Sequence, residues 1–76
     1  MKLTSECILM NSAKRTSKRG TEYIQITLLD NITSDVLSTY SDNFKLLDLE
    51  KLKEYKFTFI YNKKFKDLKV INIEIL

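Results

Sequence analysis

The sequence contains no histidine, proline or tryptophan, and it has a single cysteine and a single glycine. Without histidine and with one thiol, the chain cannot assemble a conventional zinc site or a thiol–imidazole pair. Cys7 has no partner for an intramolecular disulfide, which is typical of proteins in a reducing compartment. One glycine is too few for the loop that cradles phosphates in nucleotide-binding enzymes. We therefore expect a protein that is not an enzyme and that needs no cofactor or metal.

Long apolar runs are also missing. No stretch approaches the roughly 20 apolar residues of a membrane-spanning helix, and the N-terminal apolar run is too short for a signal peptide. A chain of 76 residues, 43% of them hydrophobic, can form one small domain around one core. We expect a single domain over residues 1–76 that is located in the cytoplasm and does not bind a membrane.

Two short segments without acids carry much of the positive charge. Residues 13–20 hold four cations, and residues 63–66 hold three. The rest of the chain has six cations against ten acids, so these segments account for the whole net charge of +3. Such clustering indicates a local anion-binding surface rather than a uniformly basic protein.

Alternation of apolar and polar residues predicts strands over most of the chain. In residues 21–29, aliphatic residues at alternate positions share one face, while Tyr23 and Gln25 share the other. In the last predicted strand the apolar parity switches near Val70, which predicts a bulge or bend there. The predicted strands are residues 2–12, 21–29, 36–41, 54–62 and 67–76.

The period changes in residues 42–53, where the apolar residues follow an approximately helical spacing. Asp42 or Asn43 is a candidate N-cap, and Asp48 is a second one that would shorten the helix to a turn or two. The apolar positions that predict this helix are Phe44, Leu47, Leu49 and Leu52.

Three strands, a helix and two strands follow one another in this prediction. This is the element order of the OB-fold, a small five-stranded, partly open Greek-key barrel. Barrel closure would also protect strand edges that no proline interrupts. We expect an all-β OB-fold barrel with one small helix, which Phe44 anchors over the bottom. In that topology the basic segments 13–20 and 63–66 are the loops that flank the binding face.

Four stretches carry a resemblance to a known family: "SAKRTSKRGTEYIQITLLD", "VLSTY", the predicted leucine-rich helix and "YKFTFIYNKKFKDLKVINIEIL". A basic loop, one glycine, an aromatic residue and a strand alternating with isoleucine recur in short OB-fold single-stranded-DNA-binding proteins of phages, plasmids and mobile elements of low-GC bacteria. The chain resembles them in element order over nearly its whole length. The resemblance implies a role in replication, transfer or recombination of a mobile element. Cellular proteins of this class usually add an acidic-tipped tail that recruits partners; here the last predicted strand runs to Leu76, and we expect no such recruitment.

Cations and aromatic residues near the predicted binding face are the candidate nucleic-acid-binding residues. Cations neutralise backbone phosphates and release counterions, and aromatic rings stack on unpaired bases. The candidates are Lys14, Arg15, Lys18, Arg19, Tyr23, Gln25, Tyr40, Tyr61, Lys63, Lys64, Phe65 and Lys66.

Structural alternatives exist for the same features. Lysine-rich hairpin tips are often ordinary solvated surface, and Tyr23 could pack across strands against Tyr40. Phe65 could fold back as a lid on the barrel. Gly20 is expected to supply a positive φ just before the second strand.

The function we expect is binding of single-stranded DNA with little sequence preference, combined with homodimer formation or cooperative self-association on DNA. One alternative is a phage or plasmid adaptor that docks its basic loops on an acidic protein. Another is an RNA-binding OB domain of the cold-shock kind.

Overall fold

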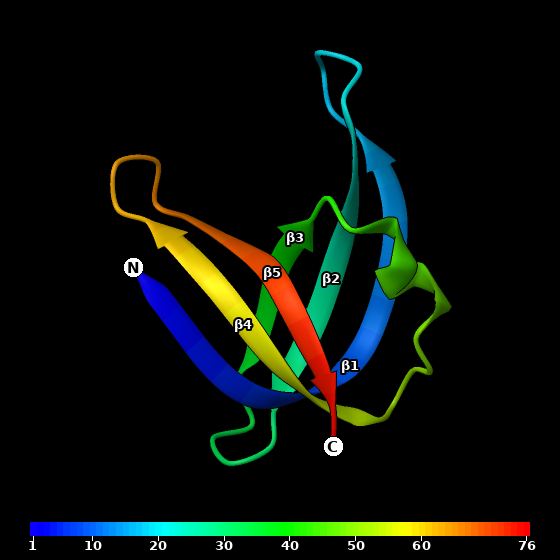
Figure 1. The fold of residues 1–76 in the computed structure, drawn as a ribbon, viewed down its shortest axis with the longest axis vertical. Coiled ribbons are helices and arrows are strands. Elements are labelled where there is room, and N and C mark those ends of the chain that lie inside the picture. Colours follow the sequence, from blue (N-terminus) through cyan, green and yellow to red (C-terminus); the bar gives the residue numbers. More distant parts are fainter.

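The computed structural model describes all residues from Met1 to Leu76. Its longest strand, β1 (Lys2–Thr16), pairs with two different neighbours, both antiparallel. The first half of β1 pairs with β4 (Glu54–Asn62), and the second half pairs with β2 (Glu22–Asp30). The register shifts between Leu9 and Asn11, and this bulge lets the strand curl from one sheet into the other. Figure 1 shows β1 in blue curving around the lower part of the molecule.

The remaining strands, β3 (Val36–Ser41) and β5 (Asp67–Ile75), close the sheet into a barrel with the order β1-β2-β3-β5-β4. All pairs are antiparallel except β3–β5, which meet in parallel at Tyr40 and Lys69. The fold is therefore an all-β, closed five-stranded barrel of the OB type. This confirms the fold class expected from the sequence.

The barrel interior is filled by the aliphatic face of β2 and the aromatic face of β4. Phe57 lies at the centre, stacked on Phe59 with ring centroids 6.2 Å apart. Burial on this scale supplies the main stabilisation of so small a chain. The buried hydrophobic residues are Cys7, Leu9, Ile24, Ile26, Leu28, Leu46, Tyr55, Phe57, Phe59 and Val70.

Side-chain hydroxyl groups reinforce the β3–β5 junction, where backbone pairing is sparse. The Thr39 hydroxyl donates to the Leu68 carbonyl, and the Ser41 hydroxyl donates to the Val70 carbonyl at 2.8 Å. Both hydroxyls are buried, so these bonds also satisfy polar groups that would otherwise be costly to bury. The junction that closes the barrel thus depends on β3 side chains as well as on its backbone.

The helix predicted over residues 42–53 is wrong in kind and length. Only a 3-10 turn, η1 (Phe44–Asp48), forms there, and no element of the structure is an α-helix. Asn43, one of the candidate caps, caps it: its side chain accepts from the Lys45 amide at 3.2 Å. Leu46 is the residue that enters the core, whereas Phe44 is 42% exposed and does not anchor the segment.

Strand bounds differ from the prediction mainly in β1, which runs four residues further than expected, to Thr16. The bounds predicted for β3 and β4 are confirmed. The bulge predicted near Val70 is confirmed: Phe59 pairs with Val70 and Thr58 with Asn72, which leaves Ile71 as the extra residue. The structure contains no helical segment that could span a lipid bilayer.

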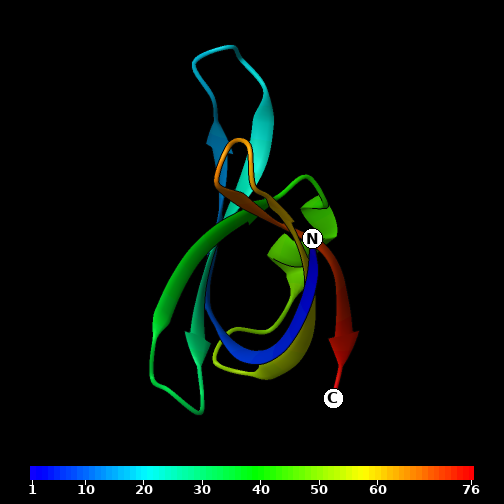
Figure 2. The ribbon, with the colours of Figure 1, turned by 90° about the vertical axis from the view of Figure 1, so that its left-hand side faces the viewer.

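The hairpin connections lie at two ends of the barrel. The β1–β2 connection (cyan) and the β4–β5 connection (orange) project from the same end in both views (Figures 1 and 2). The β2–β3 turn and the C-terminus lie at the opposite end. The two basic segments therefore belong to one end of the molecule.

Candidate nucleic-acid interface

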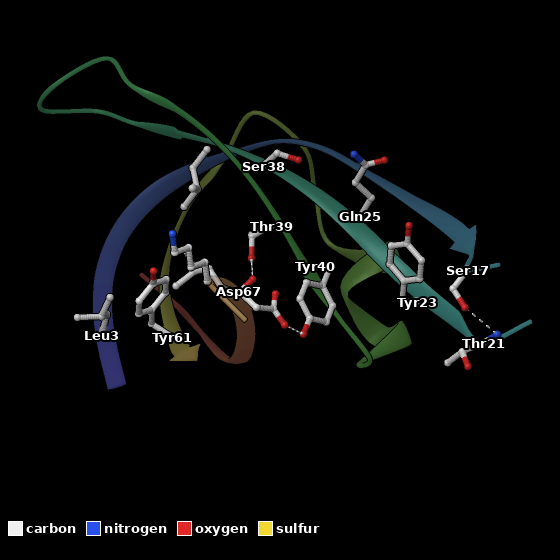
Figure 3. Close-up of a pocket in the computed structure, with 13 residues that line it drawn as sticks. Leu3, Ser17, Thr21, Tyr23, Gln25, Ser38, Thr39, Tyr40, Tyr61 and Asp67 are labelled. Atoms are coloured by element: carbon white, nitrogen blue, oxygen red, sulfur yellow. Dashed lines mark hydrogen bonds between the residues drawn. The ribbon is translucent and has the colours of Figure 1, made fainter. Parts of the chain in front are cut away.

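A groove of about 940 Å³ lies over the outward faces of β2 and β3, between the two basic connections. Figure 3 shows its lining side chains, which come from all five strands and both connections. The lining mixes apolar carbon with hydroxyl, amide and charged groups, as expected for a surface that contacts bases and phosphates. The residues that line it are Leu3, Ser17, Thr21, Tyr23, Gln25, Leu37, Ser38, Thr39, Tyr40, Tyr61, Lys66, Asp67 and Leu68.

Three tyrosines, Tyr61, Tyr40 and Tyr23, follow one another along the groove (Figure 3). The Tyr23 and Tyr40 rings meet edge to face, with centroids 6.2 Å apart and an interplanar angle of 87°. The expected cross-strand packing is therefore present, and both rings also line the groove. Because all three side chains are only half-buried, their rings offer accessible π-faces in a row.

Tyr40 is held in place by Asp67. Its hydroxyl donates to Asp67 Oδ2, and Figure 3 shows this bond in the middle of the groove. The hydrogen bond, partial burial and the nearby carboxylate charges together raise the pKa of Tyr40 to about 12. Tyr40 thus stays a neutral, oriented ring at any physiological pH.

Arg15 faces the groove even though it lies in β1 and not in a loop. It pairs with Tyr23 across the hairpin, and directly opposed residues of an antiparallel pair share one face. Its Nε donates to Gln25 Oε1 at 2.9 Å, which ties the guanidinium to the face of β2 that carries Tyr23 and Gln25. Gln25 retains its amide N–H groups as donors toward the groove.

Lys14, by contrast, faces away from the groove. It is paired with Ile24, whose side chain points into the core, so Lys14 lies on the opposite face of the hairpin. Its Nζ forms an exposed ion pair with Glu22 Oε2 at 2.8 Å. The structure therefore separates Lys14 from the other candidates and corrects the picture of residues 13–20 as one free basic loop, because Lys14 and Arg15 belong to β1.

The hairpin tip is a short closed turn. The Ser17 amide donates to the Thr21 carbonyl at 2.8 Å, and the Thr21 amide donates to the Ser17 hydroxyl at 3.1 Å. Gly20 has φ +84°, which confirms the expected positive φ. Lys18 and Arg19 are both exposed at this tip, above the end of the groove that Ser17 and Thr21 line.

The second basic connection, residues 63–66, turns around Asn62. The Asn62 side chain accepts from the Lys64 amide at 3.0 Å and from the Phe65 amide at 3.4 Å. Lys66 lines the groove, while Lys63 and Lys64 are exposed beside it. Phe65 is 70% exposed and lies outside the groove lining, so it does not form a lid; Lys64 Nζ lies 5.5 Å from its ring centroid.

Several groove residues were not among the candidates. Asp67 was not predicted, because a surface that binds a polyanion favours cations and aromatic residues, and a carboxylate is neither. Ser38 shares the outward face of β3 with Tyr40, so strand parity alone could have found it. Leu3 and Leu68 add apolar walls near Tyr61, and only the closed barrel brings Leu3 there.

No cluster of three or more histidine, cysteine or carboxylate side chains lies close enough to hold a metal ion. Cys7 is buried, and desolvation is the main cause that raises the pKa of its thiol. Asp30 accepts from the Ile32 and Thr33 amides and so serves as a turn cap.

A scan against protein-family models and a search of curated proteins both found no match.

Proposed function

We propose that the chain binds single-stranded DNA along this groove with little sequence preference. The observation that carries the proposal is the row of three half-exposed tyrosines in a groove with cations at both ends. Stacking on an aromatic ring contributes about 1–3 kcal/mol per base and tolerates any base. Tyrosines in a row suit a strand whose successive bases are unpaired.

The cations would hold the phosphates at both ends of this row. Arg15, Lys18 and Arg19 are exposed at the hairpin end, next to Ser17 and Thr21 of the groove lining. Lys66 lines the other end, and Lys63 and Lys64 are exposed in the same connection. Each phosphate contact releases counterions, so binding should weaken steeply as salt rises. The one acid of the hairpin end, Glu22, is engaged elsewhere, because it pairs with Lys14 on the opposite face.

A duplex would gain much less from the groove. Its bases are paired and stacked within the helix, so tyrosine rings reach them only at the cost of a few kcal/mol of unstacking per step. The phosphate contacts alone would remain. We therefore propose preference for single strands over duplex as the defining property.

We place this activity in replication, transfer or recombination of a mobile element, on the resemblance of residues 12–30 and 55–76 to the proteins of such elements. The same resemblance and the single cysteine favour a cytoplasmic location.

We also propose self-association through the free edge of β5. Residues 72–75 pair with β4 on one side, and β3 reaches β5 only at Lys69. In an antiparallel pair centred on Ile73, Ile71 would oppose Ile75 of a second copy, and Asn72 would oppose Glu74, so no like charges meet. Ile75 is 74% exposed, and Ile75→Lys should abolish any concentration-dependent dimer seen by sedimentation.

The test of the function is a titration of labelled oligonucleotides of about 20–30 bases over a salt series. We expect binding to single strands that is lost steeply with salt, and much weaker binding to the matching duplex. Competition by RNA of the same sequence distinguishes an RNA-binding domain from a DNA-binding one. Absence of binding at low salt would overturn the proposal and leave a protein adaptor as the function to test.

A further inference from the structure

The groove has one acidic side chain among its lining residues, Asp67. It lies between Tyr61 and Tyr40, near the middle of the tyrosine row (Figure 3). A carboxylate there repels the phosphates that the surrounding cations attract. It therefore opposes binding of the DNA backbone, and it lies where we expect the bases rather than the phosphates.

The hydrogen bonding of Asp67 determines what it offers to a base. Oδ2 accepts from the Tyr40 hydroxyl, and this commits the only proton of that hydroxyl. The other carboxylate oxygen, Oδ1, accepts no hydrogen bond from the protein. An ionised carboxylate is acceptor-only, and so is a tyrosine oxygen whose proton is engaged. Together the Asp67–Tyr40 pair presents acceptors and no donor to the groove.

Bases differ in what they can bring to such a pair. Cytosine carries the N4 amino donor and adenine the N6 amino donor, whereas thymine and uracil carry the O4 acceptor at the corresponding position. Carboxylate acceptance from cytosine N4 is an established mode of base readout, and hydrogen bonds to a charged group are the stronger ones. An O4 carbonyl in the same place would face the carboxylate without a proton between them.

We propose that the Asp67–Tyr40 pair makes this groove select bases that carry an exocyclic amino group over thymine and uracil. The inference rests on the proposed single-strand binding and adds the class of base that the groove prefers. A base stacked on Tyr61 or Tyr40 brings its edge toward Asp67, because the carboxylate lies between the two rings. Stacking supplies binding to any base, and Asp67 adds a preference at one position of the row.

The sharpest comparison uses two oligonucleotides of about 20 bases, oligodeoxycytidine and oligodeoxyuridine. They share a backbone and a ring size and differ at position 4, an amino group in cytosine and a carbonyl in uracil, and at N3, which carries a hydrogen only in uracil. The titration is run at slightly alkaline pH, where cytosine stays unprotonated and the strand stays single. We expect the wild type to bind the cytosine strand about five- to tenfold more tightly.

Asp67→Asn is the variant that tests the residue. The amide oxygen still accepts from Tyr40, but the charge is lost and an N–H donor is gained. We expect the cytosine preference to fall below about twofold or to reverse, while binding of the uracil strand is kept or strengthened. Asp42→Asn is the matched control: it also removes one exposed acid, but Asp42 pairs with Lys69 at 2.8 Å outside the groove lining. It should change both affinities by the same factor.

The outcomes separate this inference from the proposed function. Strong and equal binding of both strands by the wild type would overturn the inference and leave single-strand binding intact. Binding of neither strand would overturn the proposed function itself. A full cytosine preference in a folded Asp67→Asn protein would show that another residue is responsible.

Discussion

Lys14 and Arg15 are adjacent cations on opposite faces of the β1–β2 hairpin, and this makes them a matched pair for testing the groove. Arg15 faces the tyrosines and bonds Gln25, while Lys14 faces away and pairs with Glu22. We predict that Arg15→Ala weakens binding of single-stranded DNA and lowers its dependence on salt. Lys14→Ala should leave both nearly unchanged.

The size of the effect follows from counterion release. For single strands, each phosphate contact adds about 0.7 to the slope of log affinity against log salt. Loss of one contact therefore reduces the affinity change between about 50 and 200 mM salt by roughly 2.6-fold. Six cations are proposed to contact phosphates, and they give the wild type a slope of at most about −4. One lost contact is therefore a measurable share of that slope. The six are Arg15, Lys18, Arg19, Lys63, Lys64 and Lys66.

Fluorescence anisotropy of a labelled oligonucleotide at several salt concentrations measures these slopes. Thermal unfolding of each variant checks that the barrel is intact. The two slopes should differ by about 0.7. Equal slopes for the two variants, or a larger drop for Lys14→Ala, would refute the assignment of the groove as the DNA-binding face.

Three further predictions test other parts of the account. Tyr23→Ala should weaken binding by about 1–3 kcal/mol in the same titration, through lost stacking, and an unchanged affinity would remove Tyr23 from the site. Leu46→Ala should lower the free energy of unfolding in urea by about 2–5 kcal/mol, because it empties a buried position, yet leave the affinity of the folded protein unchanged. Tyr40 has a pKa of about 12 in the fold, above its ordinary value of 10.0, so its bond to Asp67 stabilises the fold fully below pH 10. That contribution should vanish as pH rises to 12, and the stability difference between wild type and Tyr40→Phe should shrink over the same range; a constant difference would contradict it.

Strands could be predicted from the sequence wherever alternation was strict. The predicted bounds of β3 and β4 agree with the structure, because each strand has one core-facing and one outward face. Apolar and polar residues therefore alternate along the sequence of each strand. The order of elements then led to the OB barrel, because few closed topologies suit five strands with a crossover after the third.

The end of β1 could not be predicted in the same way. Residues 13–16 have no apolar alternation, and they are strand because β2 supplies backbone partners across the hairpin. This pairing is what sends Lys14 and Arg15 to opposite faces. Charge counting treats them as equal, so the sequence reasoning could not distinguish their roles.

The prediction of a helix over residues 42–53 was wrong for a different reason. Its apolar spacing was approximate, and a segment of one or two turns has little stability of its own. Only Leu46 of the turn is buried in the barrel core, and one anchoring residue does not require a longer helix. Leu49 directly after the turn is extended, with φ −72° and ψ 143°, and this ends the helical geometry.

Asp67 shows the limit of searching by residue type. A polyanion site predicts cations and aromatics, and an acid is discarded on that criterion. Only the hydrogen bond to Tyr40 reveals that the carboxylate belongs to the groove.

The central claim, that single-stranded DNA lies along the groove between the two basic connections, is tested most directly by NMR titration of the labelled protein. With a short oligonucleotide, amide shifts should concentrate at Tyr23, Gln25, Tyr40, Tyr61 and residues 63–66. The β2–β3 turn at residues 31–35 and the η1 turn should stay unperturbed, since they lie away from the groove lining. Shifts confined to those turns, or spread evenly over the barrel, would contradict the account.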